Sequence, residues 1–127
     1  MPASSRRAVL AATLAAPFLP RLALAQPAWP TRPVRALISF PPGGAIDGVT
    51  RLIAPLMSET LGQPLVAENR GGAVGSIAAA AVASAPADGH TLLFDASQHA
   101  AAPHLLRNLS FDYATAFTPI TQILVWP

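Results

Sequence analysis

The sequence predicts an α/β domain with a mostly parallel sheet flanked by helices. Two observations predict this class. Short apolar runs typical of strands alternate along the chain with segments of helical periodicity. The first run, residues 34–40, is mostly apolar, as expected for a strand that is buried on both faces.

Each later element has its own signal. Apolar residues recur at steps of three and four over residues 45–61, which predicts an amphipathic helix that ends at Gly62. Pro55 lies inside it and costs about 3 kcal/mol there, so we expect a kink or break near residues 50–55. The remaining elements are expected to be a strand at 65–68, a helix at 76–85, a strand at 91–94, a short helix at 99–106 and a fourth strand at 120–126.

The loop at residues 40–47, with the sequence FPPGGAID, joins the first strand to the first helix. Its prolines stiffen it, and Gly43 and Gly44 let a ligand approach the main chain. The helix that follows directs free N–H groups and a partial positive charge towards the loop. This arrangement suits a small carboxylate, although a connection without a ligand explains the local pattern equally well.

Ligands of open parallel sheets bind outside the carboxyl ends of the strands. Three loops are expected there, at residues 40–47, 69–76 and 95–98. All three are expected to face one cleft.

Several motifs follow one another in a characteristic order: WPTRPVR at 29–35, PPGGAID at 41–47, LGQPLVAENR at 61–70, a glycine-rich run at 71–75, ADGHTLL at 87–93 and FTPI at 117–120. In this order they resemble the start of a Bug-type solute receptor, the periplasmic binding component of tripartite tricarboxylate transporters. The resemblance covers nearly all of the chain after residue 28. It implies a two-domain clamp of the periplasmic-binding-protein type II kind, with membrane transporter subunits as partners of the full-length protein.

In that family, the first and third loops hold a ligand carboxylate through backbone amides, hydroxyls and bridging waters. Carried over to this sequence, the resemblance implies ligand-binding roles for Phe40, Gly44, Ala45, Asp47, Ser76, Ser97 and Gln98. Asp47 has an alternative role as a cap of the helix that follows the first loop.

The N-terminus predicts an exported, periplasmic protein. A pair of arginines precedes a short apolar stretch at 8–19, and an A-x-A motif at 23–25 predicts cleavage before Gln26. The arginine pair suits either Sec or Tat export. The apolar stretch is too short for a membrane span, so we expect no membrane insertion once the signal peptide, residues 1–25, has been removed.

Charge argues against a nucleic-acid partner. Three of the eight arginines lie in the expected signal peptide, so five would remain against six acidic residues, a net charge of −1. No basic patch interleaved with aromatic residues occurs in the sequence, and nucleic-acid binding is therefore not expected.

Length limits the domain organisation. Removing 25 residues from 127 leaves 102, which suffices for one small core but not for a two-domain clamp. Residues 26–127 are therefore expected to be the incomplete N-terminal part of the first solute-binding domain, truncated before the second domain. Two alternatives remain open: a fragment of a nucleotide-binding α/β enzyme, and a truncated product without function.

Catalysis is not expected, and neither is a cofactor or a metal. The hydroxyl side chains have no evident partner base. The step of five between His99 and His104 places them on different helix faces, which is poor spacing for metal ligands. These two residues and His90 are expected to be solvated or capping. The run at 71–75 lacks the G-x-G-x-x-G spacing of a dinucleotide site.

Overall fold

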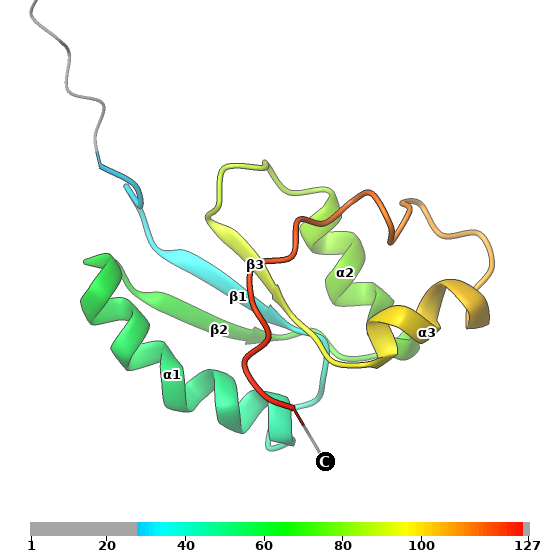
Figure 1. The fold of residues 1–127 in the computed structure, drawn as a ribbon, viewed down its shortest axis with the longest axis horizontal. Coiled ribbons are helices and arrows are strands. Elements are labelled where there is room, and N and C mark those ends of the chain that lie inside the picture. The colour runs from blue at the N-terminus through cyan, green and yellow to red at the C-terminus, as the bar shows by residue number, and fades with distance from the viewer. Residues whose placement is uncertain (1–27, 126–127) are drawn as a thin grey trace, which may run out of the picture.

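Three parallel strands in the order β2–β1–β3 form the only sheet among residues 28–125, the part of the chain that this computed structural model describes. The strands are β1 (Val34–Ile38), β2 (Leu65–Asn69) and β3 (Thr91–Phe94). The expected signal peptide lies outside the described residues. The α/β class with a parallel sheet flanked by helices is confirmed (Figure 1).

Strand β1 is the central strand and carries buried apolar side chains on both faces. Val34, Ala36 and Ile38 face one way and are fully buried, while Leu37 faces the other way and is 1% exposed. Ile38 is in register with Asn69 of β2 and with Phe94 of β3. All three strands therefore end at the same edge of the sheet.

Helices cover both faces of the sheet. Helix α1 (Ala45–Leu61) packs Ala54 against Val34, Ala36 and Ile38. On the other face, α2 (Ser76–Ala83) and α3 (Gln98–Leu105) pack Ala79 and Ala102 into a second cluster with Tyr113 and Leu93. Small side chains let α2 approach the sheet closely, and Figure 1 shows α1 separated from α2 and α3 by the strands.

Helix α1 has the predicted bounds and runs without the expected break at Pro55. Proline removes one helical hydrogen bond and crowds the preceding turn. Packing of the apolar face of α1 against the sheet outweighs that cost, since tertiary packing commonly overrides helix propensity. The side chains on this face are Ile46, Ile53, Ala54, Met57 and Leu61. Gly62 ends the helix in the left-handed region, at φ 68°, as the sequence predicted.

The expected fourth strand is wrong for the residues that the structure describes. Residues 118–125 form no strand, and Ile120 and Val125 are 77% and 70% exposed. A strand needs a neighbour to satisfy its backbone N–H and C=O groups, and no described strand pairs with this segment. Apolar sequence alone therefore predicted an element that depends on a pairing partner.

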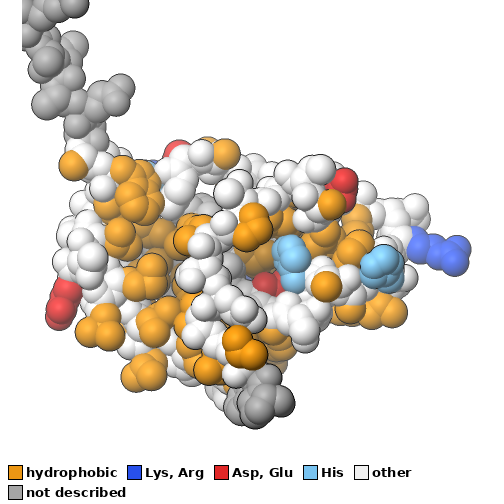
Figure 2. Space-filling model, in the orientation of Figure 1, with side chains coloured by type: hydrophobic (Ala, Val, Ile, Leu, Met, Phe, Trp, Pro, Cys, Tyr) orange, Lys and Arg blue, Asp and Glu red, His pale blue; other side chains and the backbone are white. Residues whose placement is uncertain are grey.

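Exposed apolar side chains are spread over the surface that Figure 2 shows. Leu52 and Leu56 of α1 are 75% and 65% exposed. Strand β2 is an edge strand, and one of its outward groups, the Leu65 N–H, donates to Ser58 Oγ at 2.9 Å. Within residues 28–125, no helix has the length and apolarity to cross a membrane.

Candidate functional site

The three predicted loops meet at the carboxyl edge of the sheet. Arg70 N–H donates to Ile38 O at 2.8 Å, and Ser39 N–H donates to Phe94 O at 3.1 Å, so these contacts join the starts of the loops. Helices α1, α2 and α3 all begin at this edge. We name loops 39–44, 70–75 and 95–97, together with the first turns of these helices, the carboxyl-edge site. Three helix N-termini at one edge favour an anion there. Some of their N–H groups already donate within the chain, because Ser76 N–H bonds to Ala73 O and His99 N–H bonds to Ala96 O at 2.9 Å.

Asp47 holds the first loop in place. Its side chain is 6% exposed and accepts three hydrogen bonds, each of 2.9 Å, from Gly43 N–H, Asn69 Nδ2 and Arg51 Nε. The N-cap of α1 is Gly44, which makes no side-chain capping bond. Asp47 is three residues further on and reaches back to the residue before the cap, as in a capping box displaced by one position.

These contacts also fix the charge of Asp47. The hydrogen bond from Gly43 N–H lowers the pKa of the Asp47 carboxyl below its ordinary value, and the contacts with Asn69 and Arg51 lower it further. Both carboxylate oxygens are occupied by groups of the protein. Asp47 therefore shapes the loop whose backbone faces the site.

Asn69 was not predicted as a site residue, and it ties the end of β2 to the first loop. Its Nδ2 donates to Phe40 O at 3.2 Å as well as to Asp47, and its Oδ1 accepts from Arg51 Nη2 at 2.9 Å. The second loop also touches the first: a Cβ on Gly71 would lie 3.1 Å from Pro41 N. The position of Asn69 directly after an apolar strand was the only sequence signal for this role.

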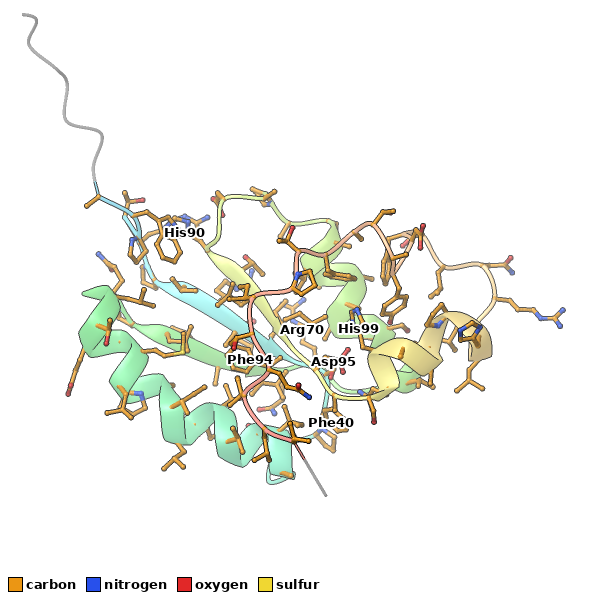
Figure 3. The ribbon with its side chains drawn as sticks, in the orientation of Figure 1. Phe40, Arg70, His90, Phe94, Asp95 and His99 are labelled. Carbon is orange, nitrogen blue, oxygen red and sulfur yellow. The ribbon has the colours of Figure 1, made fainter. Side chains whose placement is uncertain are left out.

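Asp95 joins the first and third loops. Its Oδ1 accepts hydrogen bonds from Ser39 Oγ at 2.6 Å, Ala96 N–H at 2.9 Å and Gln98 Nε2 at 3.2 Å. Its Oδ2 lies 3.0 Å from His99 Nδ1. Figure 3 shows Asp95 and His99 side by side, where β3 leads into α3. We name Ser39, Asp95, Gln98 and His99 the Asp95 cluster.

Gln98 occupies the centre of this edge. Its amide nitrogen donates to Ser39 Oγ at 3.2 Å as well as to Asp95, so its side-chain donor is used within the protein. Gly75 of the second loop lies directly against it, because a Cβ there would be 2.7 Å from Gln98 Nε2. The side chain of Gln98 thus contacts groups from all three loops.

The predicted site residues all lie at the carboxyl edge. Phe40, Gly44, Ala45 and Asp47 belong to the first loop and the start of α1, Ser76 begins α2, and Ser97 and Gln98 begin α3. Ser97 is exposed and Ser76 is half-buried. The arrangement brings all of the predicted positions to one edge and presents main chain and hydroxyl groups there.

His90 lies at the opposite edge of the sheet and is 5% exposed, so of the two roles expected for it, solvated or capping, the solvated one is wrong (Figure 3). Its Nε2 accepts a hydrogen bond from Thr31 N–H at 3.2 Å, and Nδ1 lies 3.1 Å from Asp88 O. The hydrogen bond from His90 N–H, followed by that from Arg32, lowers the pKa of the Asp88 carboxyl. This cluster fastens the segment before β1 to the turn before β3.

A surface hollow of about 330 Å³ lies elsewhere, between α1 and β2, and is lined by Arg51, Ala54, Pro55, Ser58, Leu65 and Ala67. It is wide open to solvent and contains none of the predicted site residues. No group of three or more His, Cys, Asp or Glu side chains able to hold a metal occurs in the described part of the chain.

Parallel α/β folds bind their ligands at the carboxyl edge of the sheet, which is where the three loops of this chain converge. Residues 49–127, more than half of the chain, match the family described as tripartite tricarboxylate transporter family receptor. The chain belongs to this family, and the resemblance to Bug-type receptors is confirmed.

Two curated relatives come from Bordetella. A UPF0065 protein of Bordetella bronchiseptica is 39% identical over 120 residues, which cover 90% of this chain and 35% of the relative. The protein BugT of Bordetella pertussis is 35% identical over 97 residues, covering 75% of this chain and 30% of the relative. The chain spans about a third of the length of these relatives.

Two solved structures from Rhodopseudomonas palustris resemble the chain in fold and sequence. MatC with bound malate has a TM-score of 0.64 and 42% identity, over 72% of this chain and 31% of MatC. Rpa4515 with adipate has a TM-score of 0.63 and 43% identity, over 68% of this chain and 29% of Rpa4515. At more than 40% identity over more than two thirds of this chain, both structures share sequence as well as fold with it.

Proposed function

We propose that the chain belongs to a periplasmic solute-binding protein that captures a small carboxylate for a tripartite tricarboxylate-type transporter. The observation that carries the proposal is the convergence of three loops and three helix N-termini at one edge of the sheet. The malate and adipate bound to the two similar structures support a carboxylate as the ligand.

The proposed contacts are mainly with the backbone. The N-terminal N–H groups of the three helices and the hydroxyls of Ser76 and Ser97 are the donors, with Phe40, Gly44, Ala45 and Gln98 beside them. Asp47 contributes by holding the first loop, since its oxygens are already occupied. In this role the protein binds and releases its ligand unchanged, so we propose no catalytic residue, cofactor or metal.

Replacing Gly44 with valine tests the role of the backbone. Gly44 has a φ of −77°, and an added Cβ would lie at an ordinary contact distance of 3.4 Å from Pro41 O, so the fold should accept the change. The branched side chain would shield the N–H groups at the start of α1. We expect carboxylate affinity to fall at least tenfold, with the midpoint of thermal unfolding lowered by only a few degrees because valine is less favourable than glycine at an N-cap.

Isothermal titration calorimetry with mono-, di- and tricarboxylates would measure this effect, with nucleotides as the second ligand class. Each hydrogen bond to a water-exposed site contributes about 1 kcal/mol net, so affinity for this chain is expected to be in the millimolar range or weaker. Gly48→Val is the matched control, because Gly48 faces solvent in α1. Binding of nucleotides without binding of any carboxylate would favour a nucleotide-binding enzyme fragment instead.

Export is part of the same proposal. We propose that residues 1–25 are a signal peptide and that residues 26–127 are part of the first solute-binding domain. N-terminal sequencing of the protein from the periplasm of an expressing bacterium should show Gln26 as the first residue. Recovery of cytoplasmic protein that retains Met1 would contradict the proposal.

A further inference from the structure

His99 lies at the carboxyl-edge site, and one of its two ring nitrogens is within hydrogen-bond distance of a carboxylate. Nδ1 lies 3.0 Å from Asp95 Oδ2, and the side chain is 35% exposed. Within residues 28–125, no hydrogen-bond partner is found for Nε2. Figure 2 shows a histidine exposed on the viewed face beside a carboxylate, where Figure 3 labels His99 and Asp95.

Asp95 sets the orientation of this imidazole. The carboxylate is 9% exposed and accepts only, so the hydrogen that it shares with His99 is on Nδ1. Nε2 of the neutral ring is then a hydrogen-bond acceptor, and it becomes a donor when the ring gains a proton. Asp95 itself is held by Ser39, Ala96 and Gln98, which fixes it relative to the first loop.

The other positive side chains of the described residues either form ion pairs or lie near the C-terminal end of α3. Four arginines of the described part of the chain form ion pairs: Arg32 with Asp88, Arg35 with Glu68, Arg51 with Asp47 and Arg70 with Glu68. Arg107 follows the C-terminal end of α3, and His104 lies in the last turn of that helix. At this edge Arg70 carries a permanent charge and is held by Glu68 at 3.4 Å, whereas His99, in the first turn of α3, is a group that can gain a positive charge when a ligand binds.

The surroundings of His99 restrict its movement. Its ring makes edge contacts with Tyr113 and Phe117, at centroid distances of 4.8 Å and 5.2 Å. Burial, followed by the charge of Asp95, raises the pKa of the Tyr113 hydroxyl, so it stays neutral. Tyr113 Oη is also the one buried side-chain polar atom without a partner among the described residues. Asp95 and Tyr113 are the titratable groups that face His99.

We propose that His99 gives the site its preference for dicarboxylates, with one ligand carboxylate at the helix N-termini and the second accepting a hydrogen bond from the protonated Nε2. This inference rests on the proposed function. A carboxylate that favours the protonated imidazole must be bound together with a proton. Ligand binding and protonation of His99 are therefore coupled, and Asp95 is the positioning residue that holds the imidazole ring through Nδ1.

Nuclear magnetic resonance of the labelled chain tests the coupling even at millimolar affinity. The imidazole signals of the histidines are followed against pH, alone and with saturating malate, adipate or a monocarboxylate of similar length. We expect both dicarboxylates to move the titration midpoint of His99 upwards by about half a pH unit or more. This shift corresponds to about threefold tighter binding of the ligand to the protonated form than to the neutral form. The monocarboxylate should move it less, and the midpoint of His104 should not move.

Two variants complete the test. His99→Gln should weaken dicarboxylate binding at least threefold where the wild-type ring is protonated, and less as the pH rises, whereas His104→Gln should not change binding. If dicarboxylates shift the loop amide signals and the His99 midpoint stays fixed, this inference is wrong and the proposed function stands. If no carboxylate shifts any loop amide, the proposed function and the inference fall together.

Discussion

Replacing Asp47 with alanine is expected to lower the midpoint of thermal unfolding by about 10 °C at neutral pH. The carboxylate is buried and accepts hydrogen bonds from Gly43, Arg51 and Asn69. Its removal leaves these donors without their acceptor and separates the first loop from the end of β2. Carboxylate binding should weaken with it, because the backbone donors of that loop lose their fixed geometry.

Differential scanning calorimetry of the wild type and the variant measures the effect. Glu59→Ala is the matched control, since Glu59 is an exposed acid on the same helix. It should change the midpoint by no more than about 2 °C. Equal effects of the two substitutions would show that Asp47 does not anchor the loop.

Acid should remove the same stabilisation. The pKa of Asp47 is lower in the folded chain than its ordinary value of 3.8, so its contribution is present above that value. The contribution is lost as the pH falls from there through the folded pKa. The difference between the midpoints of the wild type and Asp47→Ala should therefore be full at pH 7 and smaller at pH 3.

Replacing Gly75 with alanine is expected to destabilise the chain by about 1–3 kcal/mol, because Gly75 combines strain with close contact. It has a φ of 82°, and an added Cβ would lie 2.7 Å from Gln98 Nε2 and 3.2 Å from Ser39 Cβ. The methyl group would displace Gln98 from Ser39 and Asp95. The junction of the three loops would open, and carboxylate affinity should fall with stability.

Urea denaturation gives the change in free energy of unfolding. Gly48→Ala is the control, and its expected effect on stability has the opposite sign. Gly48 lies inside α1, and an added Cβ would meet nothing within 4 Å. That substitution should stabilise the chain by about 0.5–1 kcal/mol. A Gly75→Ala variant as stable as the wild type would contradict the contact geometry of this edge.

Local sequence patterns were enough to predict helix α1 and strand β3. The bounds of α1 follow from apolar spacing and Gly62, and β3 follows from a short apolar run after a turn. The segment after residue 118 was mispredicted because a strand depends on a neighbour that a local pattern does not contain. The effect of Pro55 on α1 was overestimated, because the packing of this helix against the sheet cannot be read from the local sequence either.

The site was predictable at the level of loops and not of side-chain partners. The rule that parallel strands end at one edge correctly brought residues 40–47 and 95–98 together. Asn69 and Asp95 were missed, and His99 was expected to be solvated or capping. Their roles depend on contacts such as that of Asp95 with Ser39, which are separated by 56 positions in the sequence.

The most direct test of carboxylate capture at the carboxyl edge is residue-resolved amide mapping with malate and with a nucleotide. The account predicts that malate shifts the backbone N–H signals at the starts of α1 and α3, including Ala45 and Gln98, with smaller changes at the start of α2. The nucleotide should leave these signals in place. Malate-induced shifts confined to the hollow between α1 and β2, or nucleotide-induced shifts at the three loops, would contradict it.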